Sequence, residues 1–171
     1  MDDVARDLLL DLIGRVDEHV LEAVRGLDEA NLLVAPEPGT NPIGWLVWHL
    51  DRVIDSHIAE LDGLPQEWET GPWAADFGLP PDPQNHGYGH TPNDVATVRP
   101  TGADVLLAYH GAASARARTF VQTLQSADFA RVVDERWDPP VTMSVRLVSI
   151  VDDAIQHGGQ AVYARGILER R

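Results

Sequence analysis

The sequence predicts an all-α protein, a four-helix bundle with a long crossover loop between its second and third helices, built as one domain over residues 1–171. Four segments of about 20 residues each repeat apolar residues every three or four positions, the period of an amphipathic helix. The composition is 44% hydrophobic and 23% charged, which is typical of a globular domain. Proline and glycine concentrate between residues 36 and 102, so an irregular connection is expected there.

The first two predicted helices are delimited by apolar stripes and by their end residues. The first covers about residues 2–25. Its apolar residues recur every four positions: Val4, Leu8, Leu12, Val16, Val20 and Val24. The second covers about residues 42–61, with Asn41 as its N-cap and Pro42 as its first helical residue. Gly63 is expected to end it.

The other two predicted helices follow the long connection. The third runs from a Thr101 cap to about residue 125, and the fourth from after Ser144 to about residue 168. The connection between residues 63 and 100 is long enough to let the second and third helices run in the same direction. Gly158 and Gly159 interrupt the fourth helix at a cost of about 2 kcal/mol relative to two alanines. A close approach between helices or access for a ligand would explain them.

Composition excludes several classes of function. The net charge of -14 repels phosphate backbones and anionic lipids, so we expect neither nucleic acid nor a membrane as partner. The absence of cysteine excludes disulfides, thiolate metal ligands and a protein thiol nucleophile. The first residues do not resemble a signal peptide, and the sequence has no run of about 20 apolar residues. The cytoplasm is therefore the expected location.

The fourth predicted helix carries a pair of residues that could bind a metal ion. Asp153 and His157 are four positions apart, which places both side chains on one helix face. A carboxylate and an imidazole in that arrangement can chelate a divalent ion, although a surface ion pair is the commoner reason for this spacing. His49 lies at the edge of the apolar stripe of the second helix, where it could reach a seam between helices or simply stay half-exposed.

Other polar and aromatic residues have two interpretations each. His57 lies near the centre of the second helix's stripe, which favours a buried histidine hydrogen-bonded inside the core over a catalytic one. Tyr88 and His90 lie in a glycine-rich stretch that could cover a site and supply a proton donor, or could be a polar turn. Trp45 and Trp48 flank His49 and could wall an apolar pocket or merely pack.

Three segments of the chain resemble a known superfamily. They are NPIGWLVWHLDRVIDSHIAEL, GPWAADFGLPPDPQNHGYGHT and WDPPVTMSVRLVSIVDDAIQHGGQAVYARGIL. Together they resemble the DinB-like (YfiT-like) metalloenzymes, and within them the actinobacterial branch often named mycothiol transferases. The resemblance implies a four-helix bundle whose metal ligands are His49, Asp153 and His157. Gln160 stands where many relatives have a further histidine, and with Trp45 and Trp48 it is a candidate for cofactor binding.

The resemblance also implies a type of reaction. The metal, zinc or nickel, would activate a low-molecular-weight thiol such as mycothiol, and the thiolate would attack an electrophilic small molecule. Catalytic candidates are His57, Tyr88 and His90. One alternative is a metal-binding, stress-related bundle without turnover. Another is an interaction bundle in which Asp153 and His157 form only an ion pair. A homodimer is a possible assembly.

Overall fold

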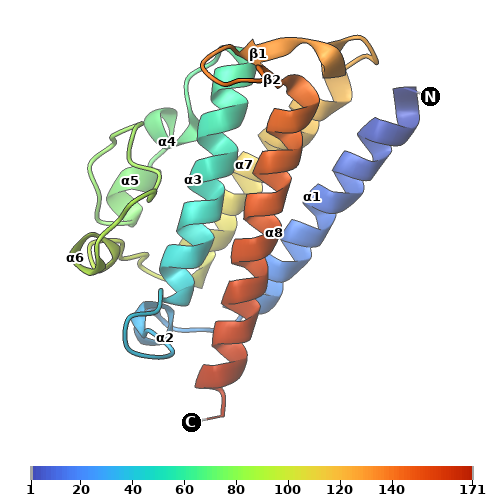
Figure 1. Ribbon diagram of the computed structural model, residues 1–171. Helices are drawn as coiled ribbons and strands as arrows, with labels where there is room; N and C mark the ends of the chain where they lie inside the picture. The colour runs from blue at the N-terminus through green and yellow to red at the C-terminus, as the bar shows by residue number, and fades with distance from the viewer. Residues whose placement is uncertain (1, 171) are drawn as a thin grey trace.

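The computed structural model describes residues 2–170, and four long helices dominate it (Figure 1). They are α1 (Asp2–Val24), α3 (Ile43–Asp62), α7 (Ala103–Thr123) and α8 (Met143–Leu168). Each long helix packs against two others, and the pairs α3 with α8 and α1 with α8 have the most extensive contacts. The predicted all-α bundle is confirmed, and its four helices lie within one or two residues of the predicted ranges.

The long helices run in two opposite directions. From the N-terminus α1 descends in Figure 1, α3 and α7 ascend, and α8 descends again to the C-terminus. The second and third long helices are therefore parallel to each other, an arrangement that the length of their connection allows. As a result, α3 and α8 are antiparallel neighbours, and the middle of one helix faces the middle of the other.

Short elements fill the connections. Between α1 and α3 lies α2 (Glu29–Leu33), and the long connection before α7 contains α4 (Glu67–Thr70), α5 (Trp73–Asp76) and α6 (Pro92–Val95). A 3-10 turn, η1 (Asp128–Ala130), precedes two short antiparallel strands, β1 (Val132–Asp134) and β2 (Val141–Thr142), which pair before α8. The segment predicted to be irregular thus contains three single-turn helices, and Trp68 and Phe77 within it are fully buried against the bundle.

Helix ends agree less well with the sequence prediction than helix positions do. Gly63 ends α3 in the left-handed conformation, as predicted. The N-cap of α3 is Pro42 rather than Asn41, and the cap of α7 is Gly102 rather than Thr101. For α8 the cap is Thr142, whose hydroxyl accepts a hydrogen bond from the Val145 amide, so this helix begins before Ser144.

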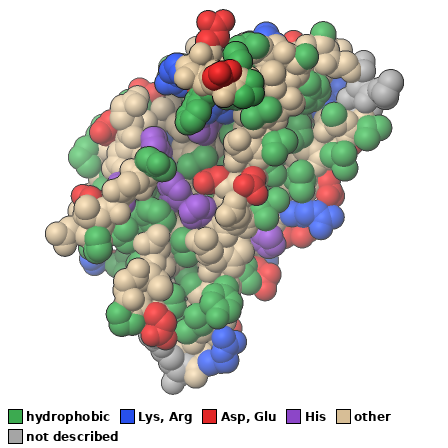
Figure 2. Space-filling view, in the orientation of Figure 1, with side chains coloured by type: hydrophobic (Ala, Val, Ile, Leu, Met, Phe, Trp, Pro, Cys, Tyr) green, Lys and Arg blue, Asp and Glu red, His purple; other side chains and the backbone are tan. Residues whose placement is uncertain are grey.

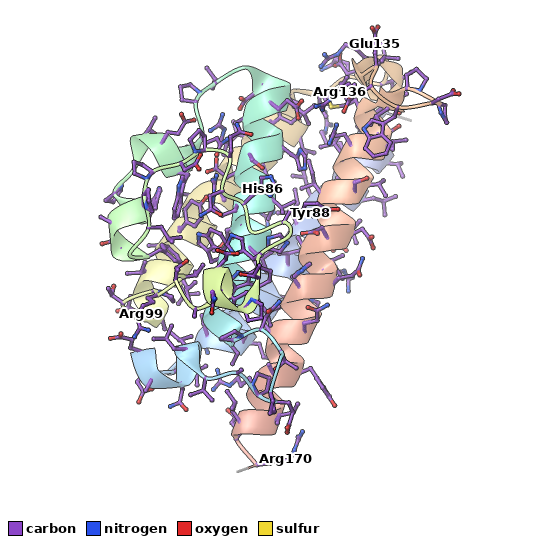
Figure 3. All side chains as sticks on the ribbon, turned by 60° about the vertical axis from the view of Figure 1, so that its left-hand side comes forward. His86, Tyr88, Arg99, Glu135, Arg136 and Arg170 are labelled. Carbon is purple, nitrogen blue, oxygen red and sulfur yellow. The ribbon has the colours of Figure 1, made fainter. Side chains whose placement is uncertain are left out.

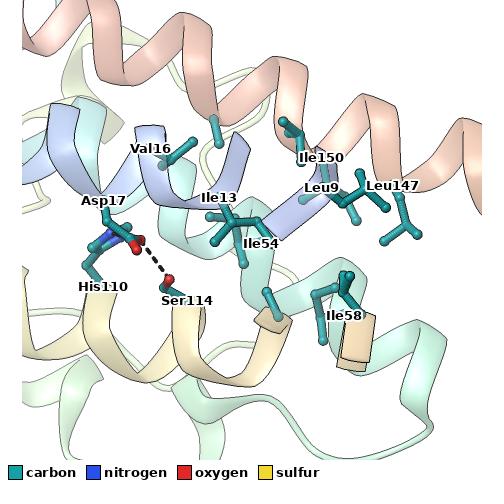
Figure 4. A pocket seen from close by; sticks show the side chains of 14 residues that line it. Leu9, Ile13, Val16, Asp17, Ile54, Ile58, His110, Ser114, Leu147 and Ile150 are labelled. Carbon is teal, nitrogen blue, oxygen red and sulfur yellow. Dashed lines mark hydrogen bonds and ion pairs between the residues drawn. The ribbon is translucent and has the colours of Figure 1, made fainter. Parts of the chain in front are cut away.

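The core contains one small cavity between the four long helices (Figure 4). Its wall is mostly aliphatic, and Asp17, His110 and Ser114 lie at one end. The cavity volume of about 20 Å³ suits a single water molecule and excludes a substrate. Within the described chain, none of the helices combines the length and apolar character needed to cross a bilayer.

A buried charged cluster joins three of the helices at the polar end of this cavity. His110 of α7 contacts Asp51 of α3 through Nδ1 at 2.7 Å and Asp17 of α1 through Nε2 at 3.0 Å. Both ring nitrogens face carboxylate oxygens, so both carry a proton and the ring is an imidazolium. Although burial opposes it, the two carboxylates raise the pKa of His110 to about 10. Its spacing in the sequence gives no hint of this role.

Helix packing explains why a glycine occurs at position 158, in the middle of α8. A Cβ at this position would lie 3.1 Å from the Cβ of His19 on α1, so the glycine permits the close approach of the two helices. A Cβ at Gly159 would meet nothing within 4 Å.

Candidate metal centre

Three side chains that are distant in the sequence meet at the seam between α3 and α8. His49, Asp153 and His157 each offer one ligand atom, and these atoms lie within 4.8 Å of one another. The two imidazole rings are 4.6 Å apart between centroids and inclined by 67°. In Figure 2, histidine side chains gather near the middle of this face beside acidic ones. Tetrahedral zinc ligands are roughly 3.4 Å apart, so small side-chain rotations would bring the three to coordination distance.

The three residues differ in exposure. The side chains of Asp153 and His157 are 32% and 20% exposed, which agrees with their predicted place at the edge of the α8 stripe. His49 is only 7% exposed. The alternative that this residue simply stays half-exposed on the helix surface is therefore wrong. The site is therefore closed on the bundle side and open toward solvent along α8.

Hydrogen bonds to backbone carbonyls define the tautomer of both histidines. Nδ1 of His49 donates to the carbonyl oxygen of His86, and Nδ1 of His157 donates to that of Asp153 at 2.9 Å. Each carbonyl accepts only, so Nδ1 is protonated and the lone pair lies on Nε2. Metal-binding histidines commonly donate their other ring nitrogen to a carbonyl in this way. Burial is the largest cause that lowers the pKa of His49, which favours the neutral ring that a metal requires.

The carboxylate of Asp153 completes the donor set. Its Oδ2 is buried and has no hydrogen-bond partner among the described residues. Nδ1 of His157 lies 3.6 Å from that oxygen, too far for a hydrogen bond, and its proton is directed to a carbonyl. An unpaired buried carboxylate oxygen is costly, and a divalent cation would compensate it. The residues present therefore fit a metal ion better than they fit an isolated ion pair.

A segment of the long connection lies against His49. Gly87 has φ +93°, and a Cβ there would come within 2.8 Å of His49 Nδ1. Trp45 stacks on the His49 ring, with centroids 4.7 Å apart and planes inclined by 16°. The backbone at His86 and Gly87 thus contacts the site. The catalytic candidates predicted from this loop were Tyr88 and His90, whereas the His86 carbonyl and Gly87 make the contact with His49. The glycine that follows His86 is the feature of the sequence that could have indicated this.

The three catalytic candidates have different surroundings in the structure. His90 has both ring nitrogens occupied, Nδ1 accepting from Trp45 Nε1 and Nε2 donating to the Asn85 side chain. Tyr88 is 88% exposed and lies on the loop in front of the bundle (Figure 3). His57 is half-buried, 3.4 Å from Arg146 and 3.6 Å from Glu60. The expected burial of His57 inside the core is therefore wrong, because the ring reaches a polar rim instead.

The candidates for cofactor contact are similarly spread. Trp48 is fully buried and packs against Trp68 and His90, which fits the packing alternative. Trp45 contacts His49 directly. Gln160 is exposed on α8, where it lines a hollow of about 360 Å³ with Leu46 and Tyr163.

A larger polar hollow has His86 in its lining. It has a volume of about 500 Å³ and is lined by His57, Glu60, His86 and Arg136, among others. Figure 3 shows His86 on the loop in front of α3 and Arg136 beside the upper part of that helix, near the start of α8. Burial, followed by the charge of Arg146, lowers the pKa of His57, and burial, followed by the charge of Arg52, lowers that of His86. Both rings are therefore neutral near pH 7.

These features define a DinB-like helical bundle with a histidine and aspartate cluster between its second and fourth long helices. The chain belongs to the mycothiol-S-transferase family, because the model of that family matches residues 8–169. It is also similar to a crystal structure described as a conserved protein from Enterococcus faecalis. That likeness has a TM-score of 0.88 at 30% identity and covers 96% of this chain and 97% of the other. A comparison with curated proteins finds no match.

Proposed function

We propose that the protein is a divalent-metal-dependent S-transferase that uses a low-molecular-weight thiol of the mycothiol type to attack an electrophilic small molecule. The observation that carries the proposal is that Asp153 Oδ2 has no hydrogen bond within residues 2–170 and lies beside two imidazoles whose Nδ1 protons are already donated to carbonyls. Membership of the mycothiol-S-transferase family supports the choice of thiol. The absence of cysteine agrees with it, because the reacting sulfur must then come from a small molecule.

The donor set favours zinc or nickel. Imidazole is a borderline ligand that suits both ions, and zinc also accepts a carboxylate oxygen. Three protein ligands are typical of catalytic rather than structural zinc sites. Such an ion would bind the thiol sulfur as a thiolate near neutral pH. His49, Asp153 and His157 would hold the ion, and Trp45 keeps the His49 ring in place by stacking on it.

The reaction that we propose is a substitution at carbon. A carbon–sulfur bond forms, the bond from that carbon to its leaving group breaks, and the thiol hydrogen is released as a proton. His57 and His86 are neutral and line a polar hollow, and the backbone carbonyl of His86 contacts His49. We propose these two rings as the acceptors of that proton. The volume of this hollow, about 500 Å³, is in the usual range for small-molecule sites.

Metal content tests the ligand set. We expect the purified protein, loaded with zinc, to hold about one ion per chain, and the variants His49→Ala and His157→Ala to hold almost none. His57→Ala is the matched control, because it removes a half-buried imidazole from the same helix as His49 and should leave the metal content unchanged. Elemental analysis after dialysis measures the result. Unchanged metal in both ligand variants would show that the assignment of ligands is wrong.

Thiol consumption tests the reaction. We expect the zinc-loaded protein to accelerate the loss of free thiol when mycothiol and a generic alkylating electrophile are mixed, and His157→Ala to fall to the rate of the two reagents alone. A colorimetric thiol assay follows the reaction. If the protein binds metal but does not accelerate thiol loss with any electrophile tested, the alternative of a metal-binding bundle without turnover takes the place of the transferase.

A further inference from the structure

We infer that Arg52 is a positioning residue for His49, because it holds the loop of residues 83–86 whose last carbonyl orients the His49 ring. The inference rests on the metal-binding part of the proposed function. It assigns to a buried arginine, outside the ligand set, control over the geometry of a ligand. Arg52 follows His49 by three positions on α3, so both side chains leave the same face of the helix.

The guanidinium group of Arg52 binds the loop backbone at two points. Nε donates to the carbonyl oxygen of Asn85 at 3.0 Å, and Nη2 donates to that of Pro83 at 3.0 Å. Arg52 is fully buried, so water does not compete for these bonds. The next carbonyl along the chain, that of His86, accepts the Nδ1 proton of His49. Two adjacent turns of one helix therefore bind three carbonyls of the same short loop.

The position of the guanidinium is itself fixed on its other sides. Nη1 donates to Asp55 Oδ2 at 3.2 Å and to the Tyr109 hydroxyl at 3.1 Å, and Nη2 donates to Gln66 at 2.7 Å. The guanidinium carbon also lies 4.8 Å from the centroid of the Trp68 ring. If Arg52 served only to neutralise the charge of Asp55, its bond to that carboxylate would be sufficient. The planar fork instead connects α3, α7 and the long connection in one arrangement, which a lysine ammonium with a single nitrogen cannot reproduce.

Without the two hydrogen bonds from the Arg52 guanidinium, the loop of residues 83–86 could move relative to α3. The His49 ring would then lose its fixed acceptor. Without a fixed His86 carbonyl, Nδ1 loses its acceptor, and the neutral ring can place its proton on either nitrogen. A ring protonated on Nε2 cannot use that atom to bind a metal. Residues that orient metal-binding histidines in this way typically change metal affinity by about 10- to 100-fold when they are substituted.

The test compares Arg52→Lys with the wild-type protein by two measurements. Titration with Co²⁺ gives the metal affinity, which we expect to fall by about 10-fold or more. Nitrogen NMR of the histidine rings in the metal-free protein gives the tautomer of His49, which we expect to be Nδ1-protonated in the wild type and mixed in the variant. A merely structural role of Arg52 would lower stability without changing this NMR signature.

Arg116→Lys is the matched control. Arg116 also binds a carboxylate, that of Asp62, and the backbone carbonyls of Leu64 and Pro65. It lies 3.7 Å from Asp55 as well, but its hydrogen bonds go to the loop that follows α3 and not to residues 83–86. We expect Arg116→Lys to change neither measurement. If Arg52→Lys does not fold, Gln66→Ala removes the second donor to the Pro83 carbonyl and should shift both measurements in the same direction, by less.

The outcomes separate this inference from the proposed function. If the wild type itself fails to bind Co²⁺, the metal proposal fails, and the tautomer of His49 still decides the role of Arg52. If the wild type binds Co²⁺ and Arg52→Lys leaves the affinity and the tautomer unchanged, the metal proposal stands and the inference about Arg52 is wrong. Equal changes in Arg52→Lys and Arg116→Lys would also overturn it.

Discussion

Replacing His110 by leucine is expected to lower the free energy of unfolding by about 3–5 kcal/mol, the usual cost of removing one partner from a buried ion pair. Asp51 is completely buried, its Oδ1 accepts from His110, and its Oδ2 has no hydrogen-bond partner among the described residues. Without the imidazolium this carboxylate has no partner for either oxygen. Urea unfolding near pH 7, followed by circular dichroism, measures the loss.

The double variant Asp51→Leu/His110→Leu is the control for this prediction. It removes the buried charge together with its partner, so we expect it to recover most of the stability lost in the single variant. Asp17 keeps Ser114 and Arg118 as partners in both proteins. If the double variant were as unstable as His110→Leu alone, the loss would come from packing around the ring, and the charge argument would be wrong.

The same cluster makes stability depend on pH in a defined direction. The pKa of His110 rises from 6.5 to about 10 on folding, so its contribution is complete below pH 6.5 and is lost as the pH rises toward 10. Burial raises the pKa of Asp17, but its bonds to His110, Ser114 and Arg118 outweigh that effect and lower the pKa to about 2. The contribution of Asp17 is therefore present above pH 3.8 and is lost as the pH falls through 2. Burial raises the pKa of Asp51, although His110 opposes this, so the Asp51 carboxyl adds to the loss of stability as the pH rises. Urea unfolding of the wild type at pH 6.5 and at pH 10 measures the fall.

The positions of the long helices could be predicted from the sequence because they depend on local periodicity. A stripe such as Val16, Val20 and Val24 indicates a helix wherever it occurs, since the spacing alone makes one face apolar. Helix starts depend on how the preceding chain enters. Thr101 is a good cap by residue type, yet Gly102 takes the capping position with an extended backbone.

The candidate site was predictable only where its residues carry a local spacing. Asp153 and His157 are four positions apart on one helix, and the family resemblance added His49. The His86 carbonyl, Gly87 and the Arg52 fork depend on the path of a long connection, and a backbone carbonyl has no signature in a sequence. The same holds for Asp17, Asp51 and His110, which come from three helices and meet only after the bundle has formed.

Gly87→Ala is expected to reduce metal affinity by about 10- to 100-fold and the free energy of unfolding by about 1–3 kcal/mol. The backbone there has φ +93°, which disfavours any residue with a Cβ. The added Cβ would also lie 2.8 Å from His49 Nδ1, 3.0 Å from Trp48 Cζ3 and 3.1 Å from Trp45 Cζ2. The loop must therefore move away from α3 and take the His86 carbonyl with it.

Gly89→Ala separates the two causes of this effect. Gly89 has a similar φ of +75° in the same loop, but a Cβ there would meet nothing within 4 Å. Both variants therefore carry the cost of a left-handed alanine, and only Gly87→Ala presses on the His49 ring. We expect both to unfold more readily and only Gly87→Ala to bind Co²⁺ weakly, as measured by titration of the folded proteins. Equal losses of affinity in the two variants would mean that flexibility of the loop, rather than its contact with His49, controls the metal site.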